Sequence, residues 1–235
     1  MTVAAPRTTW IIFDFGGCLD SDGIHSRTLF LRAFQRQGLI DDTCGTIFQD
    51  AYTKTDRKMV QDGLTHGETL RQMNDLMCRM IADNLALSDQ KSVAEAARDI
   101  TGKQAACLRR NKGVITSLKD KFRLGIISNF CGNLAIILKE FGLYDLFDFI
   151  LDSHHVGYHK PDPRIFETAI KLTGETGAAL CFMGDNPERD ICPARKLGMK
   201  TILIYDGKPP LNDGGADFTV KSFPEILTLT NIIAE

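Results

Sequence analysis

Short apolar runs alternate with amphipathic segments through the second half of this 235-residue chain. The apolar runs predict strands, at 123–128, 149–152, 180–183 and 201–205. The segments with helical spacing lie at 114–121, 134–141, 163–172 and 190–197, and a loop, an edge strand and a closing helix are predicted at 207–215, 218–220 and 223–234. Strands that alternate with helices in this way predict an α/β fold built on a doubly wound parallel sheet.

Another apolar run, at 10–13, ends abruptly in Asp14 and is followed by Gly16 and Gly17. A short apolar run bounded by glycine is typical of a buried strand in a parallel sheet. An acid at the carboxyl end of such a strand lies where open α/β sheets place their ligands. Asp14 could also be a turn or helix-capping residue. A buried carboxylate needs a cation or hydrogen-bond donors to offset its desolvation, so we favour the binding role.

The segment between this first strand and the next one shows helical periodicity and almost no strand pattern. It predicts four helices, from 26 to Gly38, at 46–61, from about 67 to 81, and at 92–101. The helical segment is therefore an insertion into the α/β domain, placed directly after Asp14. We predict an α/β core domain of residues 1–21 and 107–235, and a helical cap domain of residues 22–106 that covers the site.

Polar side chains stand at the predicted strand ends or in the loops that follow them. They are Asp14, Ser128, Asn129, Lys160, Asp185 and Asp190. Each has an ordinary explanation alone, as a cap, a turn or a solvated lysine, but the carboxyl ends of parallel strands share one edge. Three carboxylates there supply hard oxygen ligands for Mg²⁺, and one carboxylate can attack phosphorus. A lysine and a hydroxyl can hold phosphoryl oxygens, so the pattern favours phosphate-ester chemistry.

Four segments resemble the motifs of the haloacid dehalogenase-like (HAD) hydrolase superfamily. They are FDFGGCL, the strand LGII with the serine after it, HKPDPRIF, and GDNPERDICPARKLGMKTI. The closing ADFTVKSFPEIL is also similar to the usual end of the family. The resemblance implies a Rossmann-like HAD core with an inserted α-helical cap of type 1.

The resemblance also implies a role for each matching residue. Asp14 would be the nucleophile, and Ser128 and Lys160 would be the other catalytic residues. The cofactor would be Mg²⁺, held by Asp14, the backbone carbonyl of Gly16, Asp185 and Asp190. The phosphate group would be bound by Gly17, Ser128, Asn129 and Lys160.

The first motif departs from the family pattern at Gly16. HAD phosphatases usually carry a second aspartate there, which protonates the leaving oxygen and later activates water, a function worth about 10²- to 10⁴-fold in rate. The threonine that usually follows two residues later is Cys18. Asp20, Asp22 and His25 follow closely and could replace the missing acid/base, His25 because its ordinary pKa is close to neutrality. Hinge and capping roles are the simpler explanation for these residues.

These residues favour a Mg-dependent phosphatase that hydrolyses a small phosphorylated metabolite through an aspartyl-phosphate intermediate. A covered site favours small substrates. A 2-haloacid dehalogenase is the first alternative. Gly16 and the Ser128–Asn129 pair favour it, but the acidic GDNPERD segment does not, because a metal-free reaction has no use for it. A catalytically impaired HAD domain with a binding or regulatory role is the second alternative.

Composition narrows the range of partners. A net charge of −2 gives no electrostatic reason to expect nucleic acid or a membrane surface, and no apolar stretch has the length of a signal peptide or a bilayer span. The seven cysteines are scattered and contain no C-x-x-C pair, which is typical of reduced thiols in a cytoplasmic protein. The expected partner is a small-molecule phosphate ester, and the oligomeric state is left open.

Overall fold

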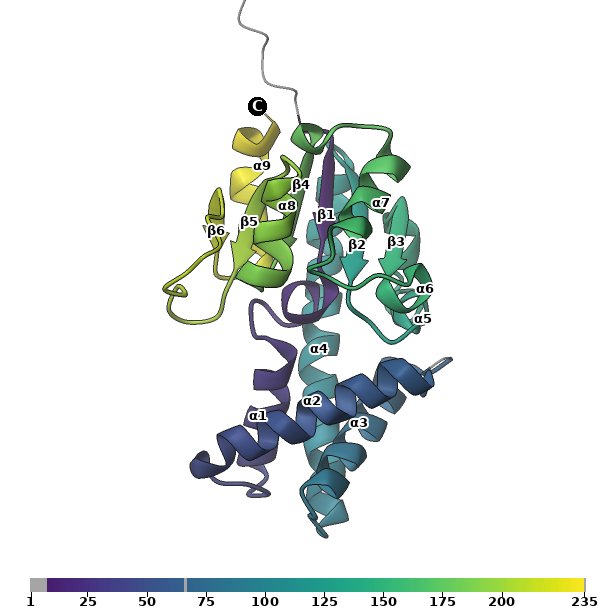
Figure 1. The fold of residues 1–235 in the computed structure, drawn as a ribbon, viewed down its shortest axis with the longest axis vertical. Coiled ribbons are helices and arrows are strands. Elements are labelled where there is room, and N and C mark those ends of the chain that lie inside the picture. The colour runs from purple at the N-terminus through teal and green to yellow at the C-terminus, as the bar shows by residue number, and fades with distance from the viewer. Residues whose placement is uncertain (1–7, 66, 235) are drawn as a thin grey trace, which may run out of the picture.

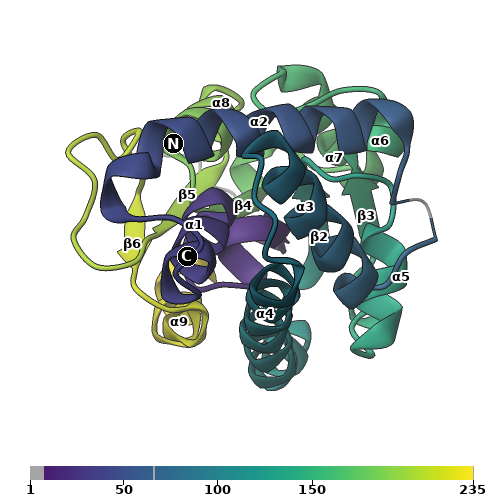
Figure 2. The same ribbon diagram turned by 90° about the horizontal axis from the view of Figure 1, so that it is seen from below.

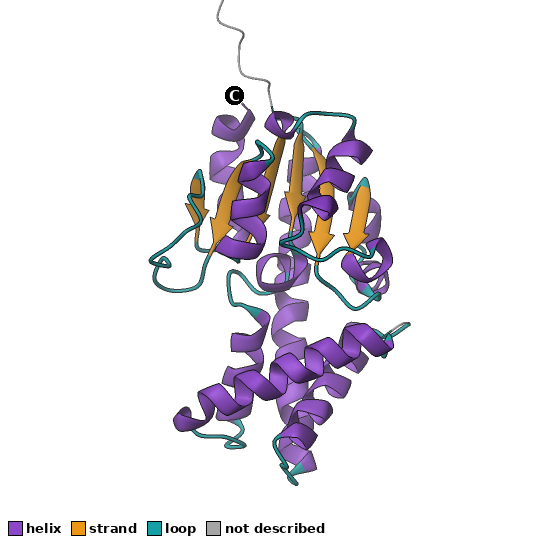
Figure 3. Cartoon of the chain, in the orientation of Figure 1, coloured by secondary structure: helices purple, strands orange, loops and turns teal. Residues whose placement is uncertain are grey.

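A computed structural model describes residues 8–65 and 67–234 of the chain. Its centre is a six-stranded sheet in the order β3-β2-β1-β4-β5-β6, in which every neighbouring pair is parallel. All the strands therefore point toward one edge of the sheet (Figure 3). The strands are β1 (Trp10–Phe13), β2 (Arg123–Ser128), β3 (Phe149–Asp152), β4 (Leu180–Gly184), β5 (Lys200–Ile204) and β6 (Phe218–Val220). The predicted α/β fold with a parallel sheet is confirmed.

Strand β1 lies in the middle of the sheet, between β2 and β4 (Figure 1). In the register, Phe13 is paired with Ile126 on one side and with Met183 on the other. The chain continues outward through β2 and β3 on one side and through β4, β5 and β6 on the other. The carboxyl end of β1 is thus the point where the strand order reverses, which is where open α/β sheets bind their ligands. Asp14 follows β1 directly.

Alternate residues of β1 are buried on opposite faces of the sheet, as the pleat requires. Ile11 and Phe13 belong to one hydrophobic cluster, and Trp10 and Ile12 belong to the other. Residues of α4, α5 and α9 complete the first cluster, and residues of α7 and α8 complete the second. The bounds of these helices are Gln90–Lys119, Leu134–Glu140, Ile226–Ala234, Pro163–Thr173 and Cys192–Lys196, and the short α6 (Ser153–Val156) follows β3.

The helical insertion lies beyond the carboxyl edge of the sheet (Figure 1). It contains α1 (Ser26–Arg36), α2 (Gly45–Asp62), α3 (Leu70–Asn84) and the first half of α4. Seen from the cap side, α2 crosses in front of the core (Figure 2). Helix α3 begins at Leu70 rather than near 67, because Thr69 and Gln72 form a reciprocal capping box at its start.

The two helices predicted at 92–101 and 114–121 are one continuous helix, α4, so the prediction of a break between them is wrong. Gly102 and Gly113 lie inside this helix, where each costs roughly 1 kcal/mol relative to alanine. Buried positions nevertheless continue through the middle of the helix, at Gln104, Leu108 and Asn111. The packing of these buried side chains outweighs the low helix propensity of the two glycines.

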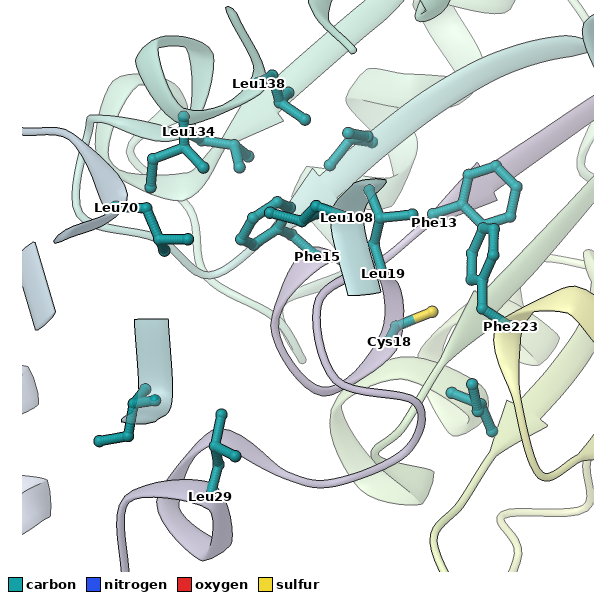
Figure 4. Close-up of a cluster of buried hydrophobic side chains, with 14 of the residues drawn as sticks. Phe13, Phe15, Cys18, Leu19, Leu29, Leu70, Leu108, Leu134, Leu138 and Phe223 are labelled. Carbon is teal, nitrogen blue, oxygen red and sulfur yellow. The ribbon is translucent and has the colours of Figure 1, made fainter. Parts of the chain in front are cut away.

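One hydrophobic cluster continues from the sheet into the cap. Phe13 and Phe223 lie together beside the sheet, while Phe15, Leu19 and Leu108 lie between the sheet and the cap (Figure 4). The boundary predicted between residues 106 and 107 falls inside α4, which packs on β2 and α9 as well as on α1 and α3. The division into core and cap therefore stays a prediction. Among the described residues, no helix combines the length and apolar character needed to cross a bilayer.

Candidate active site

Asp14 is held at the end of β1 by both its backbone and its side chain. Its N–H donates to the Met183 carbonyl at 2.8 Å, which continues the pairing with β4. Its Oδ1 accepts hydrogen bonds from Phe15 N at 2.7 Å and Ser128 Oγ at 2.9 Å, and lies 2.9 Å from Lys160 Nζ. Within the described part of the chain, Oδ2 has no hydrogen-bond or ion-pair partner. One carboxylate oxygen is therefore fixed, and the other is free to react or to bind a cation.

Lys160 is buried, and its Nζ lies 2.6 Å from Asp190 Oδ1 in addition to its contact with Asp14. Burial alone would lower the pKa of Lys160, but the carboxylates of Asp14 and Asp190 outweigh it and hold that pKa above its ordinary value. Asn129 fixes the backbone of the lysine: its Nδ2 donates to the Lys160 carbonyl at 2.8 Å, and its Oδ1 accepts from Lys160 N at 2.7 Å. Asn129 thus positions the lysine and also lines the cavity.

Three carboxylates converge on this lysine. Ligand atoms of Asp14, Asp185 and Asp190 all lie within 4.8 Å of one another. Burial and the charges of Asp190 and Asp14 raise the pKa of Asp185 well above its ordinary range, and burial raises the pKa of Asp190 to about 6 although Lys160 opposes the shift. A single ammonium group leaves an excess of buried negative charge, which a divalent cation would neutralise. An all-oxygen carboxylate donor set of this kind fits Mg²⁺.

The strain within this acidic cluster makes a prediction for Asp185→Asn in the metal-free protein. Because burial raises the folded-state pKa of Asp185 above its unfolded value, the ionised form destabilises the fold, and this cost grows as the pH rises above about 4. The variant should therefore be more stable than the wild type in EDTA, with a difference that increases from pH 5 to pH 7.5. Thermal denaturation across this pH range measures the difference in stability.

Two glycines shape the turn that follows Asp14. Gly17 has a φ of +85°, and a Cβ on it would lie 2.3 Å from Asp185 Oδ2, so only glycine lets Asp185 approach. The Gly17 N–H donates to Asp20 Oδ1 at 2.9 Å, and Gly17 does not line the cavity, so this geometry does not support the predicted phosphate contact. Gly16 is extended and lines the cavity, where a Cβ would meet only Ser26 Oγ, at 3.1 Å.

A cavity of about 510 Å³ lies between the acidic cluster and the cap. The core supplies Asp14, Ser128, Lys160, Asp185 and Asp190 to its wall, and the cap helices supply Tyr52, Asp56, Arg57, Asn74 and Gln104. Lys58 and Arg71, two further cap cations, pair instead with Asp62 and Asp75 and are not part of the wall. The volume suits a small molecule of the size that protein pockets usually bind.

The three candidates for a substitute acid/base lie in different places. Asp22 pairs with Arg110 at 2.6 Å and accepts from Phe223 N at 3.0 Å, outside the cavity wall. His25 lines the cavity and caps α1, because its Nδ1 accepts a hydrogen bond from Arg27 N at 3.2 Å. Burial, with the charges of Arg27 and Arg189, lowers the pKa of His25 to about 4. The imidazole is thus neutral near pH 7 with its proton on Nε2, which leaves no basic nitrogen free.

Asp20 is the third candidate, and it is buried in the cavity wall. Burial raises its pKa to about 6, while hydrogen bonds from Ser21, Gln104 and Gly17 oppose this shift. The three groups that form hydrogen bonds with its carboxylate, Gly17 N, Ser21 Oγ and Gln104 Nε2, are all donors, so the side chain is held as an acceptor. The sequence did not identify Gln104 or Asn74 as site residues. The available signal was a polar side chain on the apolar stripe of a helix, since both are buried at such positions in α4 and α3.

Lys160→Ala should cost about 3–5 kcal/mol of unfolding free energy in metal-free protein at pH 7.5, because it leaves buried carboxylates without their cation. Lys58→Ala is the matched control, since Lys58 forms an exposed pair with Asp62 and should cost less than about 1 kcal/mol. Denaturant unfolding measures both. Equal losses in the two variants would contradict the assignment of Lys160 as the counter-ion of the acidic cluster.

Comparisons with known proteins agree with this fold. The sequence profile of the haloacid dehalogenase-like hydrolases matches residues 11–204. Haloacid dehalogenase-like hydrolase domain-containing protein 3 from Bos taurus is 30% identical over 171 residues, which are 70% of this chain and 68% of that protein. Glyceraldehyde 3-phosphate phosphatase from Methanocaldococcus jannaschii is 23% identical over 234 residues, which are 93% of this chain and 95% of that protein.

A solved structure shows the same fold. The L-2-haloacid dehalogenase RSc1362 superposes with a TM-score of 0.64 and 20% sequence identity, over 96% of this chain and 99% of the dehalogenase. The family match covers most of the chain and contains Asp14, Ser128, Lys160, Asp185 and Asp190. The chain therefore belongs to the haloacid dehalogenase-like hydrolase family and is a hydrolase-type enzyme.

Proposed function

We propose that this enzyme is a Mg-dependent phosphatase that hydrolyses a small phosphorylated metabolite through an aspartyl-phosphate on Asp14. The observation that carries the proposal is the cluster of Asp14, Asp185 and Asp190 around one buried lysine, at the carboxyl edge of the sheet. A reaction at carbon that needs no metal has no use for three carboxylates this close. The similarity to a glyceraldehyde 3-phosphate phosphatase along nearly the whole chain supports the same class of reaction.

In the first step of this reaction, Asp14 Oδ2 attacks phosphorus and the bond between phosphorus and the ester oxygen breaks. Ser128 and Lys160 hold Oδ1, so they orient the other oxygen for the attack. Lys160 Nζ lies within ion-pair distance of both Asp14 and Asp190, and its ammonium group carries three N–H donors, so it can also donate to a phosphoryl oxygen. In the second step, water attacks phosphorus and the bond between phosphorus and Asp14 Oδ2 breaks, which regenerates the carboxylate and releases inorganic phosphate. One proton of this water is given up to solvent and balances the proton that the departing alkoxide takes from solvent.

Mg²⁺ would be held by Asp14, Asp185, Asp190 and the Gly16 carbonyl, and would supply charge neutralisation between these carboxylates and the phosphate. The position two residues after the nucleophile carries no acid. Gly16 therefore leaves the departing alkoxide without a proton donor at the usual place, and esters with good leaving groups should react fastest.

Two alternatives make different predictions. A 2-haloacid dehalogenase would use Asp14 against carbon and release halide without metal, and a binding or regulatory HAD domain would release neither product. Gly16 is the feature that favours both of them, because neither needs the missing acid.

One assay separates the three functions. Phosphate release is measured from p-nitrophenyl phosphate and from a panel of sugar and nucleotide phosphates, with Mg²⁺ and with EDTA, and halide release is measured from 2-chloropropionate. The proposal expects phosphate release that EDTA abolishes. Halide release in EDTA would support the dehalogenase, and silence in both assays would support the binding domain.

A further inference from the structure

Asn74 of α3 carries an orphaned hydrogen-bond acceptor in the wall of the cavity. Its side chain is fully buried, and it is part of the cavity lining. Its Nδ2 donates to Gln104 Oε1 at 2.7 Å and to Thr101 Oγ1 at 3.0 Å. Its Oδ1 has no hydrogen-bond partner anywhere in residues 8–65 and 67–234. A buried acceptor without a donor is costly, so such a group in a cavity wall calls for an explanation.

A series of hydrogen-bonded side chains determines which end of the Asn74 amide is left without a partner. Gln104 Nε2 donates to Asp20 Oδ2 at 2.7 Å, so the carbonyl end of Gln104 faces Asn74. Asn74 must then turn its amino group toward Gln104. Thr101 agrees with this orientation, because its hydroxyl already donates to the Ala97 carbonyl and can only accept from Asn74. The Asn74 carbonyl is the end that remains.

Asp20 sets the polarity of the whole chain because it can only accept. Its Oδ1 receives Gly17 N at 2.9 Å and Ser21 Oγ at 2.6 Å, and its Oδ2 receives Gln104. The carboxylate that braces the turn after Asp14 therefore also orients an amide on the cap. The cap also supplies apolar side chains to the cavity wall, among them Phe30, Met73 and Met77.

We propose that Asn74 is a specificity-determining residue whose Oδ1 accepts a hydrogen bond from a hydroxyl group on the alcohol part of the substrate. Asp20 and Gln104 are positioning residues that present this acceptor. The substrate class is thus a phosphate ester of a hydroxylated alcohol, such as a polyol phosphate, and the inference rests on the proposed phosphatase function. A site built to bind a hydroxyl discriminates strongly against an analogue that lacks it, because its own buried acceptor is then left unpaired.

The test uses phosphate esters that share one carbon skeleton and differ in one group. The three-carbon set is propane-1,2-diol 1-phosphate, hydroxyacetone phosphate and propyl phosphate, which carry a hydroxyl, a carbonyl or neither. Four- and six-carbon sets built in the same way cover other distances from the phosphate. At one chain length or more, the wild type should prefer the hydroxyl ester over the other two by about 10- to 100-fold in kcat/KM.

Asn74→Leu should remove this preference, because it lowers kcat/KM for the hydroxyl ester by about 10-fold or more relative to kcat/KM for the alkyl ester. Asn84→Leu is the matched control, since Asn84 lies on the same helix but is exposed and outside the cavity wall. It should leave the preference intact. If Asn74→Leu lowers all esters equally, or if the wild type shows no preference at any chain length, Asn74 is a structural residue and the proposal is wrong.

Asp20→Asn tests the positioning role, because it should change the preference between the hydroxyl ester and the carbonyl ester, which a purely structural role of Asp20 would leave unchanged. The new amide can donate to Gln104, which reverses both amides, so that Asn74 Oδ1 accepts from Gln104 and the Asn74 amino group takes the position of its carbonyl. The Thr101 hydroxyl, which donates to the Ala97 carbonyl in the wild type, then turns to donate to Asn74 Oδ1. The ratio of kcat/KM for the hydroxyl ester to that for the carbonyl ester should then fall by about 10-fold or more, because a carbonyl accepts the hydrogen bond that Asn74 now donates. An unchanged ratio would overturn the role of Asp20. Phosphate release by the wild type separates the two hypotheses. Release from none of the esters, p-nitrophenyl phosphate and the sugar and nucleotide phosphates included, refutes the phosphatase itself, whereas release without a preference for the hydroxyl esters refutes only the role of Asn74.

Discussion

Asp14→Asn should abolish phosphate release, with a fall in kcat of about 10⁴-fold or more, because an amide oxygen cannot replace the attacking carboxylate. The substitution keeps the size of the side chain, and an amide oxygen can still accept from Phe15 N and Ser128 Oγ. The loss should therefore be chemical rather than structural. Initial rates with p-nitrophenyl phosphate and saturating Mg²⁺ measure it.

The control for this variant is Asp62→Asn, which removes a carboxylate from an exposed ion pair with Lys58 on the cap. It should retain wild-type turnover. Thermal denaturation in EDTA should show that Asp14→Asn folds and is no less stable than the wild type, since one charge has left a crowded acidic cluster. Residual turnover above about 1% of wild type in a folded Asp14→Asn enzyme would place the nucleophile elsewhere.

Gly16→Asp should raise turnover of alkyl phosphates by about 10²- to 10⁴-fold, because it supplies a proton donor two residues after the nucleophile. The backbone there is extended, with φ −74° and ψ 127°, so an L-residue fits without strain. A Cβ would meet only Ser26 Oγ, at 3.1 Å, and the position lines the cavity. Glycine at this position is therefore not required by the fold.

The dependence of the rate gain on the leaving group shows whether Gly16→Asp acts by supplying a proton. Alkoxides depart poorly without a proton, whereas nitrophenolate departs readily, so the gain should be much smaller with p-nitrophenyl phosphate than with propyl phosphate. Gly16→Asn is the matched control, because it has the same shape and no acidic proton. Equal rates for the two variants on propyl phosphate would show that the proton comes from another source in this enzyme.

Local patterns in the sequence were sufficient for the sheet and for the chemical groups at its edge. The alternation of apolar runs and helices predicted the parallel sheet, because the period of the side chains depends on each segment alone. Once the strands are parallel, Asp14, Ser128 and Asp185 must meet at one edge, and the structure places them there. Their convergence follows from topology and needs no detailed packing.

Helix α4 shows where local patterns fail. Gly102, Gly113 and the charged residues around Arg110 predict an interruption, yet the helix continues because it packs on α1 and α3 at one end and on β2 and α9 at the other. Those contacts join residues that are distant in sequence. The stabilisation that these contacts give to α4 depends on the assembled fold, so it cannot be predicted from the residues of α4 alone.

The sequence by itself determined the fold class, the family and the residues with reactive side chains, because periodicity and motif spacing are properties of short segments. Only the tertiary structure decided how each side chain is used. It separated Asp22, which pairs with Arg110 outside the cavity, from Asp20, which braces the turn after Asp14. It also joined Asp20 through Gln104 to Asn74. Hydrogen-bond polarity and desolvation depend on neighbours from other elements, and these exist only once the chain has folded.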